Sequence, residues 1–190
     1  MEKIILTALL MGLSVSGLHA QKPQIEPTFT EWHDLQTNAV NRFATHTDFF
    51  AFAPNDESAW KRNDRKASTN YLSLDGDWKF NWVEHANQRP TDFFRTDYDD
   101  SQWKTLHVPG IWEMNGYGDP VYVNVGFAWR GNFKNNPPEV PIQDNHVGSY
   151  RRTITIPDNW TGKQVIAHFG SVTSCIYLWV NGKFVGYSED

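Results

Sequence analysis

The chain has 190 residues and a formal net charge of −5; 39% of its residues are hydrophobic and 15% aromatic, with nine Trp. This length suffices for one domain with a hydrophobic core, or for a domain and a tail. The charges are spread without a Lys/Arg cluster, which excludes the phosphate-neutralising surface of a nucleic-acid-binding protein. Abundant Trp and Tyr suit both an all-β core and a surface that stacks on sugars.

Residues 1–20 have the pattern of a secretory signal peptide. Lys3 supplies the positive start, residues 4–18 form an apolar run, and Ala20 is the small residue before the expected cleavage. This run is too short and wrongly flanked for a stable membrane span. We therefore expect an exported protein, periplasmic or extracellular, that has no membrane-spanning segment.

The only cysteine is Cys175, so an exported form cannot make an internal disulfide and must depend on its hydrophobic core. Cys175 lies in an apolar run. We therefore expect it to be a small buried residue.

Residues 21–70 show no strong periodicity and contain Pro23, Pro27 and Pro54 among many Asp, Asn and Thr. This composition predicts an extended N-terminal arm that wraps a larger body. The Phe residues at 49, 50 and 52 are the expected anchors of the arm.

From residue 71 onward the pattern changes to short strands separated by turns. Every second residue belongs to a candidate inward-facing set in five places, at 78–82, 106–108, 150–156, 165–169 and 176–180, and at 78–82 polar residues separate the aromatic ones. Asn181-Gly182 predicts a type I′ hairpin, because both central residues of that turn need a positive φ. No long amphipathic helix is expected after the signal peptide. The pattern predicts an all-β fold, an antiparallel β-sandwich or jelly roll.

The stretch from residue 111 to residue 148 is rich in Gly, Pro and aromatic residues and shows no strand pattern. A loop of this length in a compact domain is usually functional. We expect it to hold its shape while reaching toward a ligand or another domain.

Several catalytic chemistries lack their motifs here. Gly116 and Gly118 form only a G-x-G without the third glycine of a nucleotide-binding loop, and the histidines show no zinc-ligand spacing. A retaining glycosidase needs two carboxylates about 5–5.5 Å apart. Glu113, Glu139 and the final Glu189-Asp190 do not pair by spacing, so no catalytic residue is assigned to this chain.

Five segments, in order, resemble the sugar-binding domain of glycoside hydrolase family 2. They are Leu74–Phe80, Val108–Glu113, Tyr117–Val125, Asn136–Pro141 continued by Gly148–Arg152, and Leu178–Asp190. Asn41-Arg42 and His46 resemble the arm that precedes this domain. The segment Asn136–Pro141 (N-P-P-E-V-P) resembles a motif of the large β-galactosidase branch of this family. Residues 126–135 resemble an insertion that could alter the substrate mouth.

The resemblance implies a jelly roll over residues 71–190 that leans on an (α/β)₈ barrel carrying both catalytic glutamates. It implies that Asn124 and Asp190 bind galactose hydroxyls and that Asp190 also binds a monovalent cation. For the longer protein it implies Mg²⁺ and Na⁺ or K⁺, a downstream immunoglobulin-like domain and a β-galactoside substrate. It leaves open whether that protein is a homo-oligomer.

The resemblance also implies that the jelly roll is incomplete at the C-terminus, because family domains continue with further strands. Unpaired strand edges and an open core would then make the chain fold poorly or aggregate, without activity. Three alternatives stay open. The chain could be a stand-alone carbohydrate-binding module, a structural or oligomerisation domain, or part of a family 2 hydrolase with another specificity, such as a β-glucuronidase or β-mannosidase.

Overall fold

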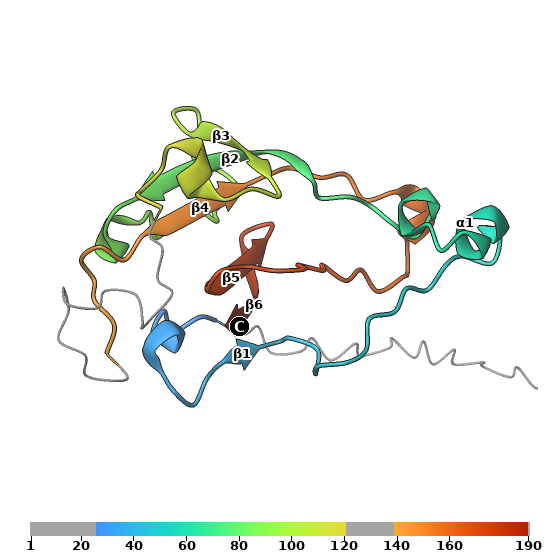
Figure 1. Ribbon diagram of the computed structural model, residues 1–190, viewed down its shortest axis with the longest axis horizontal. Coiled ribbons are helices and arrows are strands. Elements are labelled where there is room, and N and C mark those ends of the chain that lie inside the picture. Colours follow the sequence, from blue (N-terminus) through green and yellow to red (C-terminus); the bar gives the residue numbers. More distant parts are fainter. Residues whose placement is uncertain (1–25, 121–138, 190) are drawn as a thin grey trace, which may run out of the picture.

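The computed structural model describes residues 26–120 and 139–189 (Figure 1). The expected signal peptide, the candidate site residues Asn124 and Asp190, and the insertion at 126–135 lie outside the described residues. Within the described ranges no helix has the length and apolar character needed to cross a membrane.

The described residues form two three-stranded antiparallel sheets, ordered β3-β2-β4 and β1-β6-β5. The strands are β1 Ala39–Val40, β2 Gly76–Val83, β3 Lys104–Val108, β4 Val147–Arg151, β5 Cys175–Val180 and β6 Lys183–Glu189. Figure 1 shows the β3-β2-β4 sheet above the layer that contains β5, β6 and β1. This arrangement confirms the expected all-β, antiparallel class.

Helical structure is short throughout the described residues. The α-helix α1 spans Glu57–Lys61, and the 3₁₀ turns are η1 Glu31–His33, η2 Arg65–Ala67, η3 Ala86–Gln88, η4 Trp112–Asn115 and η5 Asp158–Trp160. A helix of five residues cannot be stable by itself, so these pieces act as connectors between strands.

Strand β2 carries the alternation of Trp78, Phe80 and Trp82 that predicted it. Phe80 is only 1% exposed, and its ring lies 4.7 Å from the ring of Tyr150 on the neighbouring β4. On the other side β2 pairs with β3, where Leu106 is 2% exposed. The inward face of β2 is therefore the centre of the first sheet's core.

The β5–β6 hairpin turns at Asn181 and Gly182, whose φ angles are 50° and 78°. Both values are positive, as a type I′ turn requires, and the predicted hairpin is confirmed. The register shifts between Leu178 and Trp179, which is the signature of a β-bulge.

An aromatic group around Trp179, here called the Trp179 cluster, connects the two sheets and the arm. The Trp179 ring stacks on Phe94 at 5.1 Å with 9° between the planes. The cluster also contains Phe29 from the arm, Phe93 beside Phe94, and Tyr177 and Phe184 from the hairpin. Because Phe93 and Phe94 belong to the connection between β2 and β3, these contacts tie the first sheet to the second.

The arm is attached to the second sheet in two places. Strand β1 pairs with β6, with Ala39 opposite Ser188. Glu31 is 6% exposed and accepts hydrogen bonds from the Thr28 amide at 2.7 Å and from the Tyr177 hydroxyl at 2.8 Å. Burial works to raise the pKa of Glu31, but the hydrogen bonds from Thr28, the Glu31 amide and Tyr177 together hold that pKa below 4.5.

We expect the arm to loosen from β5 in acid. The folded-state pKa of Glu31 lies below its unfolded value, so its carboxylate stabilises the fold fully above the unfolded pKa. This stability is lost as the pH falls through the folded-state pKa. Between about pH 5 and about pH 3 the urea midpoint should fall more steeply in the wild type than in Glu31→Gln.

Trp fluorescence during urea unfolding measures the midpoints of the wild type and of Glu31→Gln, at a chain concentration low enough to avoid aggregation. Glu57→Gln is the matched control, because Glu57 pairs with Lys61 on the surface and its side chain is 68% exposed. The urea midpoint of this control should fall with pH as steeply as that of the wild type. Equal slopes for the wild type and Glu31→Gln would show that the buried carboxylate is not the acid-sensitive contact.

The expected Phe anchors of the arm are only partly correct. Phe50 contacts Phe52 at 4.8 Å and Tyr71 at 6.2 Å between ring centroids. Phe49 is 70% exposed, and its ring lies 5.2 Å from the ring of His46, which is itself exposed. A buried Asp56 holds the following turn instead, accepting hydrogen bonds from the Ser68 hydroxyl and the Thr69 amide.

The predicted strand at 165–169 is not formed, and the one predicted at 150–156 is formed only at Tyr150 and Arg151. Strand β4 ends at Arg151, and residues 152–156 and 164–169 adopt no regular structure in the described chain. Ile154 and Ile156 are 44% and 40% exposed, and Val165 and Phe169 are 49% and 40% exposed. The alternation is present, but a strand also needs a neighbour to pair with, and no described strand lies alongside these segments.

The expected burial of Cys175 is also wrong, because Cys175 is exposed. It is the first residue of β5, which lies at the edge of its sheet among the described strands. The apolar run indicated a strand correctly. It could not indicate that this end of the strand faces solvent.

Candidate functional site

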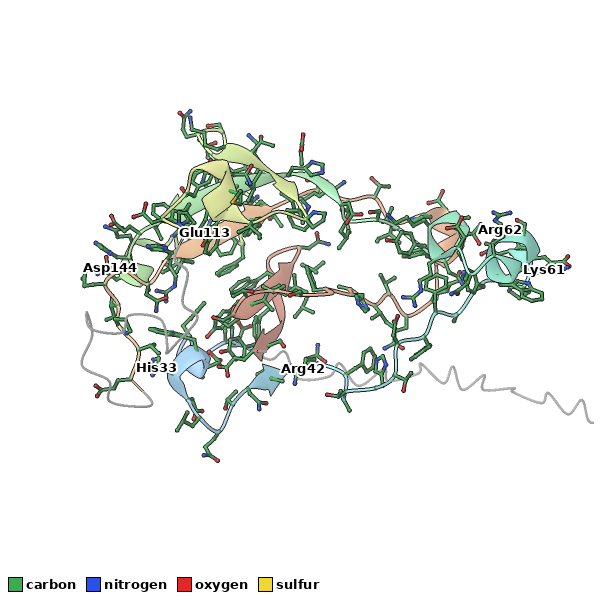
Figure 2. The ribbon with its side chains drawn as sticks, viewed as in Figure 1. His33, Arg42, Lys61, Arg62, Glu113 and Asp144 are labelled. Atoms are coloured by element: carbon green, nitrogen blue, oxygen red, sulfur yellow. The ribbon has the colours of Figure 1, made fainter. Side chains whose placement is uncertain are left out.

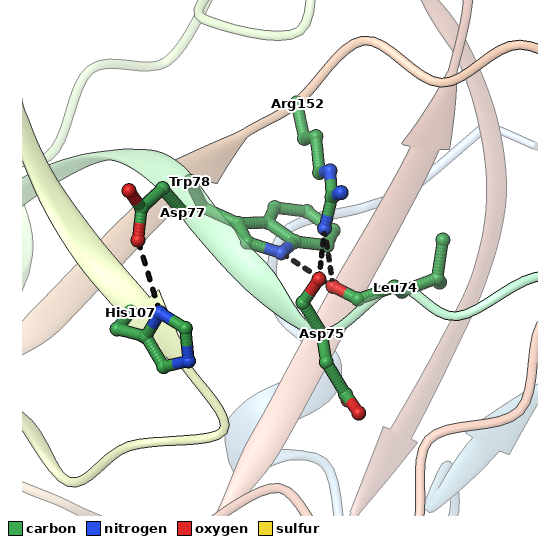
Figure 3. A network of polar contacts seen from close by, with 6 residues as sticks. All are labelled: Leu74, Asp75, Asp77, Trp78, His107 and Arg152. Atoms are coloured by element: carbon green, nitrogen blue, oxygen red, sulfur yellow. Dashed lines mark hydrogen bonds and ion pairs between the residues drawn. The ribbon is translucent and has the colours of Figure 1, made fainter.

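The turn that precedes β2 is held by residues from two of the motif segments. The Arg152 Nη1 atom donates to the Leu74 carbonyl at 2.6 Å and to the Asp75 carbonyl at 2.9 Å. Trp78 Nε1 donates to the same Leu74 carbonyl at 2.9 Å, and the guanidinium lies over the Trp78 ring (Figure 3). Gly76 allows this approach with a φ of 122°. These motif residues therefore hold the turn before β2 through its backbone carbonyls.

Arg151, the neighbour of Arg152, holds a different segment, residues 93–100 of the β2–β3 connection. Its Nε donates to Asp100 at 2.8 Å, and its Nη1 donates to the carbonyls of Phe93 and Arg95. Both side chains of the Arg151–Asp100 pair are largely buried, 22% and 28% exposed. The two consecutive arginines thus fix two different turns, because successive side chains of a strand point to opposite faces.

Aromatic residues from β2 and from the described parts of the 111–148 stretch pack together. Tyr117 packs its ring on Phe80 at 4.9 Å, and Trp82 lies 5.0 Å from the His146 ring. Gly148 lets Trp112 approach, since a Cβ on Gly148 would lie 2.6 Å from the Trp112 ring. Among the described residues no acceptor reaches the buried Nε1 of Trp82. Sequence reasoning singled out Gly116–Gly118 here, but not this aromatic packing.

Strand β6 leads directly to Asp190. Tyr187 is 2% exposed, and its hydroxyl donates to the Glu189 carboxylate. Burial and this carboxylate raise the pKa of Tyr187. The Glu189 amide donates to the Asn38 carbonyl at 3.0 Å. The strand end is therefore fixed from inside by Tyr187 and from outside by the arm.

The described carboxylates near these places already have partners. Glu113 accepts a hydrogen bond from the Trp112 indole, and Glu189 accepts one from Tyr187. Burial, with Glu113 nearby, raises the pKa of Tyr150 to about 12. Glu139 is exposed. Across residues 26–120 and 139–189, no three His, Cys, Asp or Glu side chains gather to hold a metal ion.

The structure does not place Asn124 or Asp190 relative to each other, because both lie outside the described residues. What it does bring together is the framework on either side of them. The β2–β4 core supports both ends of the long loop, and the arm with β5 supports the strand that runs into residue 190.

Comparison with known proteins identifies the family of this framework. The family model for glycosyl hydrolases family 2, sugar binding domain, matches residues 71–190. The chain belongs to glycosyl hydrolase family 2. The match covers both sheets apart from β1, and it includes every motif segment from Leu74 to Asp190.

Curated relatives of this family 2 chain are named β-galactosidases. The chain is 37% identical over 163 residues to the β-galactosidase of Priestia megaterium, covering 85% of this chain and 16% of the relative. It is 38% identical over 157 residues to that of Halalkalibacterium halodurans, covering 83% and 15%. It is 34% identical over 169 residues to the β-galactosidase large subunit of Leuconostoc lactis, covering 83% and 26%. The chain thus spans about a sixth to a quarter of these relatives.

Proposed function

We propose that this chain is the sugar-binding N-terminal part of an exported retaining β-galactosidase that hydrolyses terminal β-D-galactosides in carbohydrate catabolism. The observation that carries the proposal is the identity of 34–38% to proteins named β-galactosidases, over more than four-fifths of the chain. The pattern of residues 1–20 supports export to the periplasm or the extracellular space. The names of these relatives favour galactosides over glucuronides or mannosides.

In this proposal the catalytic glutamates belong to an (α/β)₈ barrel elsewhere in the longer protein, which also carries an immunoglobulin-like domain. One glutamate protonates the glycosidic oxygen, and the other forms a galactosyl-enzyme that water hydrolyses with retention. Asn124 offers both a donor and an acceptor to sugar hydroxyls, and the Asp190 carboxylate accepts from them. The longer protein binds Mg²⁺ and Na⁺ or K⁺, and carboxylate oxygens such as those of Asp190 suit the monovalent ion.

We expect Asn124→Ala and Asp190→Ala, made in the longer protein, each to raise the KM for a chromogenic galactoside about tenfold. Each variant removes hydrogen bonds to the sugar, and each such bond contributes roughly 1 kcal/mol or more. Steady-state kinetics on 2-nitrophenyl β-D-galactoside gives KM and kcat for each variant. Proton NMR of the first product identifies the anomer, and the β-anomer would confirm retention.

Two outcomes would favour the other classes. An unchanged KM and kcat for Asn124→Ala would indicate a structural or oligomerisation domain. If the 190-residue chain is monodisperse and binds galactose, and no longer protein containing it is made, it is a carbohydrate-binding module.

The exposed apolar residues at 152–156 and 164–169 support the proposal that further strands of the longer protein complete the jelly roll. Ile154, Ile156, Val165 and Phe169 are each at least 40% exposed. Such alternating segments with unpaired edges associate with any available strand. The purified 190-residue chain is therefore expected to aggregate and to show no turnover, as size-exclusion chromatography and a galactoside assay would show.

A further inference from the structure

We propose that Arg42 of the arm is a positioning residue for the sugar site, because it holds Ser188 and Glu189, the two residues of β6 that precede Asp190 in the sequence. This inference rests on the proposed role of Asp190 in binding the galactoside. Arg42 lies on the arm just after β1, beside the strand end that it contacts (Figure 2).

One nitrogen of Arg42 bonds to two oxygens at the end of β6. Its Nη1 donates to the Ser188 hydroxyl at 2.8 Å and to the Glu189 carbonyl at 3.0 Å. The Ser188 hydroxyl donates to the same Glu189 carbonyl, also at 3.0 Å. The three groups form a closed triangle, and hydrogen bonds from a charged donor are the stronger kind.

The oxygen at the centre of this triangle belongs to the peptide group that joins residue 189 to residue 190. A peptide group is planar, so fixing its carbonyl oxygen and its strand end also fixes the orientation of the following nitrogen. The Glu189 amide is held on the preceding side by the Asn38 carbonyl. The arm therefore holds both the amide and the carbonyl of Glu189, the residue that precedes Asp190 in the sequence.

Local structure explains why an arginine at this place can reach the strand end. Asn41 has a φ of 53°, a left-handed conformation that Asn tolerates better than most residues, and it turns the chain after β1. Its side-chain amide donates to the Val185 carbonyl at 2.7 Å, which ties the turn to β6. Gly186 lies against this crossing, where a Cβ would be 2.6 Å from the Val40 carbonyl oxygen.

Both acceptors of Arg42 are neutral oxygens, and Arg42 is itself exposed. Loss of the side chain should therefore leave no buried charge and cost little global stability. The predicted effect falls instead on the geometry of the strand end. A misplaced binding group can lower the efficiency of an enzyme by up to about a hundredfold, so even a moderate shift is measurable.

The test measures galactoside kinetics and amide exchange for Arg42→Ala, Arg42→Lys, Asp190→Ala and Arg62→Ala in the longer protein. We expect Arg42→Ala to raise KM about fivefold to tenfold with kcat changed less than twofold, and Arg42→Lys to recover part of the loss. Arg62→Ala is the matched control, since Arg62 is an exposed arginine of the same arm, 62% exposed, and it should behave as the wild type. Exchange should increase at the amides of residues 188–190 in Arg42→Ala alone.

The outcomes separate this inference from the proposed function. A raised KM in Asp190→Ala with a wild-type KM in Arg42→Ala would overturn the positioning role and leave the sugar site standing. Wild-type kinetics for Asp190→Ala would refute the sugar site itself, and with it the positioning role. If Arg42→Ala and Arg62→Ala show equal exchange at residues 188–190, Arg42 does not hold the strand end.

Discussion

Replacing Trp179 with Ala is expected to lower the free energy of unfolding by about 3 kcal/mol. Trp179 stacks on Phe94 at 5.1 Å and lies 6.1 Å from Phe29 and 5.7 Å from Phe184 between ring centroids. These partners come from the β2–β3 connection, the arm and the hairpin. The substitution therefore removes a contact that three parts of the chain share. The side chains of any one of these parts cannot fill the cavity that remains.

Urea unfolding followed by far-ultraviolet circular dichroism measures this change without depending on the removed fluorophore, at a chain concentration low enough to avoid aggregation. Trp60→Ala is the matched control, because Trp60 is 51% exposed and contacts only the neighbouring Lys61 among the described ring interactions. It should leave the midpoint nearly unchanged, and Trp179→Phe should recover part of the loss. A cost for Trp179→Ala no greater than that for Trp60→Ala would show that the two sheets are not joined through this cluster.

The elements that could be predicted from the sequence are those whose cause is local. Asn181-Gly182 supplies two positive φ angles within two residues, so the turn and the pairing of β5 with β6 follow from the turn type. The alternation in β2 similarly indicates which side of the strand is buried. In both cases the residues that decide the structure are neighbours in the chain.

The failures have non-local causes. The segments 152–156 and 164–169 also carry apolar residues at alternate positions, yet they pair with no described strand and expose their Ile, Val and Phe side chains. The exposure of Cys175 likewise depends on its place at a sheet edge. Periodicity describes the two faces of a segment, and it does not say which strand, if any, lies beside it.

Motif resemblance indicated segments that lie within the family domain at residues 71–190, but not the contacts that each of their residues makes. Arg152 and Trp78 both bind the Leu74 carbonyl, so two motifs far apart in the sequence form one scaffold. The sequence indicated Arg42 only as part of the Asn41-Arg42 pair, which resembles the arm that precedes the family domain. Its contact with Glu189 bridges 147 positions of sequence and could come only from the fold.

Arg151→Ala is the second large effect, with an expected cost of about 2 kcal/mol in the free energy of unfolding. The guanidinium bonds to Asp100 and to the carbonyls of Phe93 and Arg95, so its loss leaves a largely buried carboxylate without its cation. The same change frees the segment that carries Phe93 and Phe94 to the Trp179 cluster. Arg151 and Trp179 should therefore be coupled rather than additive.

A double-mutant cycle with Trp179→Ala tests this coupling through urea unfolding. We expect the double variant to cost at least about 0.5 kcal/mol less than the sum of the two single changes, since each loosens the same segment. Arg95→Ala serves as the control, because its side chain pairs with Asp97 on the surface and is 58% exposed. It should leave the midpoint unchanged. Strict additivity of Arg151→Ala and Trp179→Ala would mean that the clamp on β4 and the Trp179 cluster stabilise the domain independently.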